Sequence, residues 1–203
     1  MAPTTPPPPR LAVLISGGGR TLLNLQDRID EGSLHALIPL VIASRPCPGA
    51  ERAAARGLAV RTLPGTIPRE TLASLFREFA IDYAVLAGYL NLVQTPPGYE
   101  GRIVNIHPAL LPRFGGKGMY GHRVHEAVLK SGDRESGCTV HLVDERYDTG
   151  PILLQRRCPV LPGDTPDTLA ARVFDLETRA FPDALKLLFS ARPAGPQPTK
   201  RES

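Results

Sequence analysis

The stretch Arg102-Ile-Val-Asn105-Ile-His107-Pro-Ala-Leu-Leu-Pro112 decides how the rest of the sequence is interpreted. Its apolar, β-branched start predicts a strand, and Pro108 ends that strand because proline has no N–H for the ladder. Side chains alternate across a strand, so Asn105 and His107 are expected on one face, at the strand's end. A lone histidine in such a place is more often structural. A carboxamide beside it, however, favours a site that stabilises an oxyanion and moves a proton.

Strands and helices alternate along the sequence on both sides of this stretch. Apolar runs and glycine or proline boundaries predict strands over 11–15, 36–44, 58–63, 81–87, 102–107, 138–143 and 152–160. Helical spacing predicts helices over 20–29, 49–57, 68–79, 125–129 and a long amphipathic one over 164–188, capped by Asp164 or Thr165. This order implies an α/β fold with a mainly parallel sheet and helices on both faces.

The first predicted strand runs directly into Gly17-Gly18-Gly19-Arg20-Thr21. A strand, a glycine loop and a helix start form a ready anion site, because backbone N–H groups and the helix dipole both favour negative charge. The loop matches neither the dinucleotide pattern Gly-x-Gly-x-x-Gly nor the Walker loop with its lysine. An ordinary left-handed turn fits the residues equally well, and the position at the start of the sheet favours a phosphate.

Two further segments follow predicted strands. Gly88-Tyr-Leu-Asn-Leu-Val93 is apolar and is interpreted either as core or as the wall of a pocket for a flat ring. The loop 144–151 carries three carboxylates, of Asp144, Glu145 and Asp148. Solvated loop acids are the default reading, yet a carboxylate that reaches His107 raises the pKa of the imidazole and fixes its ring. Spacing alone does not select which acid reaches it.

Composition limits the class of protein. A chain of 203 residues with 42% hydrophobic content is expected to bury one core, over residues 11–190, with disordered proline-rich tails at 1–10 and 191–203. The net charge of +4 is scattered and tryptophan is absent, which argues against nucleic acid. Three separated cysteines indicate neither a disulfide framework nor a metal site. With no targeting or membrane-spanning segment visible, we expect a cytoplasmic protein.

The motifs Asn105-x-His107-Pro-Ala-Leu-Leu-Pro112 and Asp148-Thr-Gly-Pro-Ile152 together resemble the formyltransferase family that uses 10-formyltetrahydrofolate. The resemblance extends from Leu11 to about Leu188 and implies a Rossmann-like formyltransferase fold with a mixed sheet. It is nearest to the members that formylate 5′-phosphoribosylglycinamide in purine synthesis. It implies formyl folate as co-substrate, no metal, small-molecule partners only, and a monomer or homodimer.

The resemblance also implies roles for individual residues. His107 is similar in position to the family's proton donor, Asn105 to the amide that holds the formyl oxygen, and Asp148 to the acid that raises the pKa of the histidine. The implied contacts to phosphoribosylglycinamide are Gly17, Gly18, Gly19, Arg20, Thr21 and Glu177. The implied contacts to folate are Arg69, Leu90, Asn91, Leu92, Val93 and Asn105.

The sequence departs from the family pattern at three places. Close relatives often have Ser-Asn where this chain has Arg20-Thr21, which adds a positive charge near the expected phosphate. They often have arginine where this chain has Asn91, and the absence of that arginine removes a potential folate contact. The glycine-rich segment 116–121 lengthens the loop before His125.

The implied reaction is direct attack of a primary amine on the formyl carbon, through an oxyanion intermediate, and no cysteine or serine stands beside a base as a nucleophile. The nearest alternative is a formyltetrahydrofolate deformylase, in which water replaces the amine. A formyltransferase for a nucleotide-linked amino sugar is a further one. Methionyl-tRNA formyltransferase is disfavoured, because it needs an additional C-terminal domain. A non-catalytic nucleotide-binding module would explain the glycine loop but not Asn105, His107 and Asp148.

Overall fold

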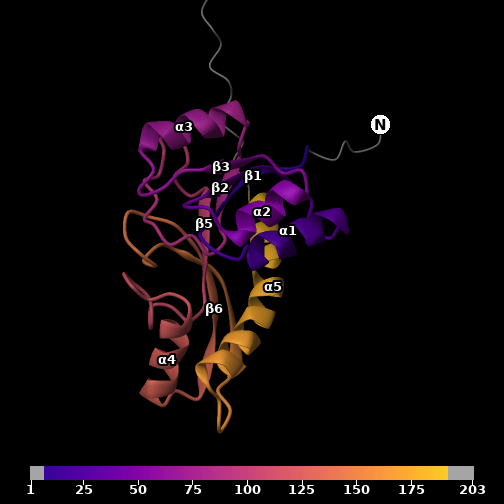
Figure 1. The fold of residues 1–203 in the computed structure, drawn as a ribbon. Helices are drawn as coiled ribbons and strands as arrows, with labels where there is room; N and C mark the ends of the chain where they lie inside the picture. The colour runs from indigo at the N-terminus through magenta and orange to yellow at the C-terminus, as the bar shows by residue number, and fades with distance from the viewer. Residues whose placement is uncertain (1–6, 192–203) are drawn as a thin grey trace, which may run out of the picture.

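The structure, a computed structural model, describes residues 7–191 and is built on one seven-stranded sheet (Figure 1). The strand order is β3-β2-β1-β4-β5-β6-β7. The strands are β1 (Arg10–Ile15), β2 (Leu37–Ala43), β3 (Val60–Thr62), β4 (Tyr83–Leu86), β5 (Ile103–His107), β6 (Glu135–Leu142) and β7 (Ile152–Pro159). The first five are parallel to one another, and β6 pairs antiparallel with both β5 and β7, which makes the sheet mixed.

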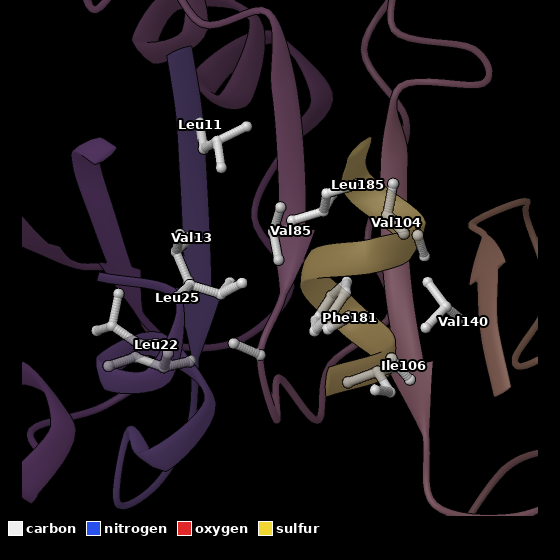
Figure 2. Packing of buried hydrophobic residues seen from close by; sticks show 14 of the residues in the cluster. Leu11, Val13, Leu22, Leu25, Val85, Val104, Ile106, Val140, Phe181 and Leu185 are labelled. Atoms are coloured by element: carbon white, nitrogen blue, oxygen red, sulfur yellow. The ribbon is translucent and has the colours of Figure 1, made fainter. Parts of the chain in front are cut away.

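Helices cover both faces of the sheet, as the alternating sequence pattern predicts. They are α1 (Arg20–Asp30), α2 (Pro48–Ala55), α3 (Arg69–Glu78), α4 (His122–Ser131) and α5 (Pro166–Ser190). On one face, buried side chains of α1, α2, α4 and α5 contact the sheet, and Figure 2 shows Phe181 and Leu185 of α5 beside Val104 and Ile106 of β5. On the other face, Leu72 and Phe76 of α3 belong to a separate buried cluster.

The register of β5 positions the polar residues that concern function. Val104 and Ile106 face the cluster that contains α5, so Asn105 and His107 project from the opposite face. Because β6 pairs antiparallel with β5, His141 stands opposite Asn105 and Thr139 stands opposite His107. The chain order reverses between β1 and β4, and the carboxyl ends of β1, β4 and β5 therefore meet beside this switch point.

The predicted elements are all present, with shifted ends. Strand β6 begins at Glu135, three residues before the predicted start, because pairing with β7 outweighs the poor strand propensity of Ser136 and Gly137. Helix α4 begins at His122 rather than at residue 125. Of the two candidate caps of α5, Thr165 is the actual one, in a capping box with Thr168.

Two predictions concern the chain ends and membranes. Of the predicted tails, 1–10 and 191–203, residues 1–6 and 192–203 lie outside the described residues, while Arg10 already belongs to β1. Within residues 7–191, none of the helices has the length and apolar character needed to cross a bilayer.

Candidate active site

His107 ends β5 and is buried, with 3% of its surface exposed. Its Nε2–H donates to the carbonyl oxygen of Phe114 at 2.8 Å, and its Nδ1 lies 3.5 Å from Oδ2 of Asp148. Burial, with the adjacent His141 ring, lowers the pKa of His107 by more than the carboxylate of Asp148 and the carbonyl of Phe114 raise it. Asp148 acts on this pKa in the predicted upward direction, but the pKa of His107 lies below its usual value because desolvation of the imidazolium is the larger effect.

Side chains of β6 and β7 hold the segment that follows His107 in place. The Thr139 hydroxyl donates to the carbonyl oxygen of Ala109 at 2.6 Å and accepts from the N–H of Leu111 at 3.0 Å. The Gln155 side chain donates to the carbonyl oxygen of Leu111 at 2.9 Å. These bonds fix the turn after Pro108, and with it the carbonyl of Phe114 that orients the imidazole.

Asp148 is the acid, among the three in its loop, that reaches His107. Its carboxylate accepts the N–H of Gly116 at 2.9 Å and the side-chain N–H of Asn105 at 3.4 Å. Burial acts to raise the pKa of Asp148, but the adjacent rings of His141 and His107 and the Gly116 N–H together hold it below its usual value. Asp148 is therefore a carboxylate at neutral pH.

The other features of this loop explain why Asp148 points inward. Asp144 binds its own loop, accepting from the Arg146 N–H and the Thr149 hydroxyl. Gly150 lies so close to β6 that an added Cβ would collide with the carbonyl oxygen of Leu142. Glycine thus lets the loop fold against the strand that faces the site.

Sequence reasoning missed His141. Its Nδ1–H donates to the carbonyl oxygen of Leu142 at 2.9 Å, which leaves Nε2 to face the Asn105 amide nitrogen at 3.1 Å and Asp148 Oδ1 at 3.5 Å. Its side chain is 2% exposed. Thr139 and His141 are two residues apart, which places their side chains on one face of a strand. That pattern points to the site only when the antiparallel pairing of β5 and β6 is known.

These polar groups open onto a cavity of about 430 Å³, here called the site cavity. Of the predicted site residues, it is lined by Thr21, Leu90, Asn91, Leu92, Val93, Asn105, His107, Asp148 and Glu177. The loop 116–121 and His141 also line it. Leu90 to Val93 form a mostly apolar wall opposite polar groups, an arrangement that suits a flat ring carrying a reactive polar edge.

The apolar wall is fixed to two neighbouring segments. The Ser16 hydroxyl, at the end of β1, accepts the N–H of Leu90 at 3.0 Å and the hydroxyl of Ser44 at 2.7 Å. The Asn91 side chain donates to the carbonyl oxygen of Gly65 at 2.8 Å, so the residue that departs from the family pattern has a structural contact here. Arg69 starts α3, is exposed, and does not line the site cavity.

The first glycine loop leads into α1 with no side-chain cap on its first N–H groups. Gly19 is in the left-handed conformation, and Thr21 in the first turn lines the site cavity, so the start of α1 faces it. Gly17, Gly18, Gly19 and Arg20 do not line the cavity themselves. The guanidinium of Arg20 instead lies over the Phe174 ring, 3.6 Å from its centroid.

Glu177 of α5 brings a second titratable carboxyl group to the site cavity. Burial raises the pKa of Glu177 to about 7, and the positive charge of Arg20 partly opposes that rise. The group is therefore shared between its neutral and charged forms near neutral pH. Such a carboxyl can both donate and accept hydrogen bonds at a substrate.

No cluster of three or more potential ligands within residues 7–191 is arranged to hold a metal ion. The polar groups that meet at the end of β5 are an amide, imidazoles and a carboxylate, of Asn105, His107, His141 and Asp148. Together they are suited to acyl chemistry, in which negative charge develops on a carbonyl oxygen while a proton moves between nitrogen atoms.

A sequence profile of the family described as "Formyl transferase" matches residues 9–185. The chain belongs to the formyl transferase family. A relative named phosphoribosylglycinamide formyltransferase, chloroplastic, from Vigna unguiculata is 42% identical over 193 residues, which are 90% of this chain and 62% of that protein. The chain thus spans less than two thirds of the length of this member of the formyl transferase family.

Solved structures with the same architecture carry similar names. Glycinamide ribonucleotide transformylase 1 from Symbiobacterium toebii has a TM-score of 0.83 and 35% identity, over 93% of this chain and 91% of that one. Phosphoribosylglycinamide formyltransferase from Bacillus halodurans has a TM-score of 0.81 and 33% identity, over 93% of this chain and all of the other. These likenesses agree with the predicted fold class, a Rossmann-like formyl transferase fold with a mixed sheet.

Proposed function

We propose that the protein transfers the formyl group of 10-formyltetrahydrofolate to the primary amine of 5′-phosphoribosylglycinamide, a step of purine biosynthesis. The observation that carries this proposal is the convergence of Asn105, His107 and Asp148 on one cavity at the carboxyl end of β5. The names of the relatives supply the acceptor, and membership of the formyl transferase family supplies the reaction type.

The proposed chemistry begins with attack of the amine nitrogen on the formyl carbon. The carbonyl oxygen becomes an oxyanion, and the Asn105 N–H and the imidazole N–H of His107 stabilise it. In the free protein these donors bind His141, Asp148 and Phe114, so substrate binding must redirect them.

Proton transfer completes the reaction. The imidazole of His107, with Nδ1 facing the Asp148 carboxylate, hands its Nε2 proton to the folate nitrogen as the carbon–nitrogen bond to folate breaks. Nε2 then takes up the proton that the attacking amine has lost, which leaves the formylated amine and tetrahydrofolate. The nearby Asp148 carboxylate stabilises the imidazolium.

The proposed binding mode uses the rest of the site cavity. The phosphate of the acceptor binds the start of α1, where Gly17 to Gly19 leave the first-turn N–H groups uncapped beside Thr21 and the positive charge of Arg20. Glu177 contacts the glycinamide substrate. The folate ring lies against Leu90 to Val93, and Arg69, outside the cavity, contacts the anionic end of the folate.

The test compares reactions with and without the amine. Purified protein is incubated with formyl folate and phosphoribosylglycinamide, with formyl folate alone, and with formyl folate and a nucleotide-linked amino sugar. We expect folate turnover and formylated product in the first mixture only. Equal folate turnover without the amine would identify a hydrolase, and turnover only with the amino sugar would identify a different acceptor.

The proposal includes the setting in which the enzyme acts. We propose small-molecule partners, a monomer or homodimer, and a cytoplasmic location. The buried free thiols of Cys47, Cys138 and Cys158 are consistent with a reducing compartment.

A further inference from the structure

A second cavity lies on the other side of the segment that follows the catalytic histidine. Its volume is about 560 Å³, against about 430 Å³ for the site cavity, and the two share no lining residue. Residues 110–114 form one wall, and residues 133–136 with Gln155, Arg157 and Val128 form the others. It is therefore a separate space, and not an extension of the proposed substrate site.

The charges around the second cavity do not cancel. Arg113 pairs with Asp133 at 2.5 Å, and Arg157 pairs with Glu135 at 2.9 Å. Arg134 lies between the two acids in sequence, lines the same cavity and has no ion pair among the described residues. Three guanidinium groups thus face two carboxylates, and one positive charge remains for a ligand.

Apart from Ser136 and Gln155, the rest of the lining is apolar. Leu111 and Val128 are buried, and Leu110 and Phe114 are partly buried beside them. A guanidinium binds the oxygens of phosphate or carboxylate through paired N–H groups, while aliphatic walls bind an apolar body. The lining is therefore complementary to a small oxyanion attached to an apolar or aromatic group.

The wall of this cavity also holds the proposed catalytic residues. Phe114 lines the second cavity, and its carbonyl oxygen accepts a hydrogen bond from His107 Nε2–H at 2.8 Å. The Leu111 side chain reaches the position that a Cβ on Gly115 would occupy, and that position also lies against Asp148. A ligand that displaces 111–114 must alter the environment of the His107–Asp148 pair.

From these contacts we propose that the second cavity is a regulatory binding site for a small oxyanion that carries an apolar body, and that its occupation changes turnover at the site cavity. The change in turnover rests on the proposed function. Binding itself does not, so failure of this inference and failure of the proposed formyl transfer are distinguishable.

The experiment titrates the full chain with phenyl phosphate by calorimetry, first alone and then in the presence of phosphoribosylglycinamide. Benzoate tests the carboxylate as the anion, and benzyl alcohol is the uncharged control. We expect saturable binding of phenyl phosphate, benzoate or both, and at least about ten-fold weaker binding of benzyl alcohol. Equal binding of all three, no binding, or loss of binding when the amine substrate is present would overturn the site.

Two charge-reversal variants test whether Arg134 binds the ligand. Arg134→Glu is expected to weaken binding by about ten-fold or more, while the matched reversal Arg77→Glu, at an exposed arginine of α3, leaves it unchanged. Both side chains are exposed, so circular dichroism is expected to show both variants folded. Equal losses in the two variants would indicate a nonspecific charge effect and overturn the assignment.

Turnover measurements test the coupling. Saturating phenyl phosphate is expected to change kcat at least about two-fold with little change in the KM for the amine, since the two cavities are separate. The effect is expected to be lost in Arg134→Glu. Binding with unchanged kcat, or purely competitive inhibition, would overturn the regulatory role.

Discussion

The two glycine-rich loops beside the site cavity use glycine for different physical reasons. Where the first loop packs against α2, space is missing: a Cβ on Gly19 would lie 2.8 Å from the Cα of Gly49, and a Cβ on Gly49 of α2 would lie 2.6 Å from the carbonyl oxygen of Gly17. In the second loop, Gly116 and Gly118 have open space around them but φ angles of 99° and 88°. The first loop is part of the packed framework, and the second is a segment shaped by backbone conformation alone.

This difference indicates how each loop serves the site. The first loop fixes the start of α1 against α2, which a phosphate site requires. The second loop contributes the Gly116 N–H to Asp148 and lines the site cavity without being packed on both sides. Four substitutions test the comparison.

The largest effect is expected where the second loop meets the proposed catalytic pair. Asp148→Asn removes the charge that stabilises the imidazolium of His107 and weakens the anchor of Gly116. We expect kcat/KM to fall about a thousand-fold, with much smaller change in folate binding. NMR titration of His107 is expected to show a pKa lower than in the parent protein. An unchanged rate would remove Asp148 from the mechanism.

The next effect tests the lack of space in the first loop. Gly49→Ala is expected to reduce the free energy of unfolding by about 3 kcal/mol, since the backbone of Gly17 and Gly19 must move. Gly17→Ala is the matched control, because a Cβ there meets nothing within 4 Å, and it is expected to cost less than about 0.5 kcal/mol. Urea unfolding measures both, and equal losses would contradict the comparison.

A pH experiment tests the carboxyl group beside the first loop. The folded protein holds the pKa of Glu177 at about 7, above its usual 4.5, so it binds more protons than the unfolded chain between these values. Stability from this group is present at low pH and is lost as the pH rises through about 7. Glu177→Gln is expected to gain about 2 kcal/mol relative to the parent between pH 5 and pH 8. Parallel stability curves from urea unfolding would refute the raised pKa.

The smallest effect tests the backbone of the second loop. Gly118→Ala has space for its methyl group, so only the positive φ is strained, and we expect a loss of about 1 kcal/mol or less. Gly118→Asn is expected to lose less, because asparagine tolerates the left-handed conformation better. Thermal unfolding of the two variants compares them. A loss as large as that of Gly49→Ala would show that the second loop is packed like the first.

Sequence reasoning succeeded where local patterns carry the information. The run Leu11 to Ile15, the alternation that puts Asn105 and His107 on one face, and the cap at Thr165 each follow from neighbouring residues. It was less accurate at the start of β6, where Ser136 and Gly137 are poor strand formers that pair because β7 lies beside them.

The candidate site shows the same difference between what local patterns predict and what depends on distant segments. The position of His107 at a strand end was predictable from Pro108, and the choice of Asp148 came from a family resemblance. His141 was missed, because its proximity to Asn105 depends on the antiparallel addition of β6 to a parallel sheet. No local pattern encodes which strand becomes the neighbour of another.

The sequence by itself determined the order of strands and helices, the uncapped glycine start of α1 and the two motifs that carry the formyl transferase resemblance, since each is written in residues close together along the chain. Only the tertiary structure decided the direction in which the pKa of His107 is shifted. The pKa of His107 is lowered because the fold removes the imidazole from water more effectively than Asp148 compensates, and that balance of desolvation and charge exists only after distant segments have packed around it.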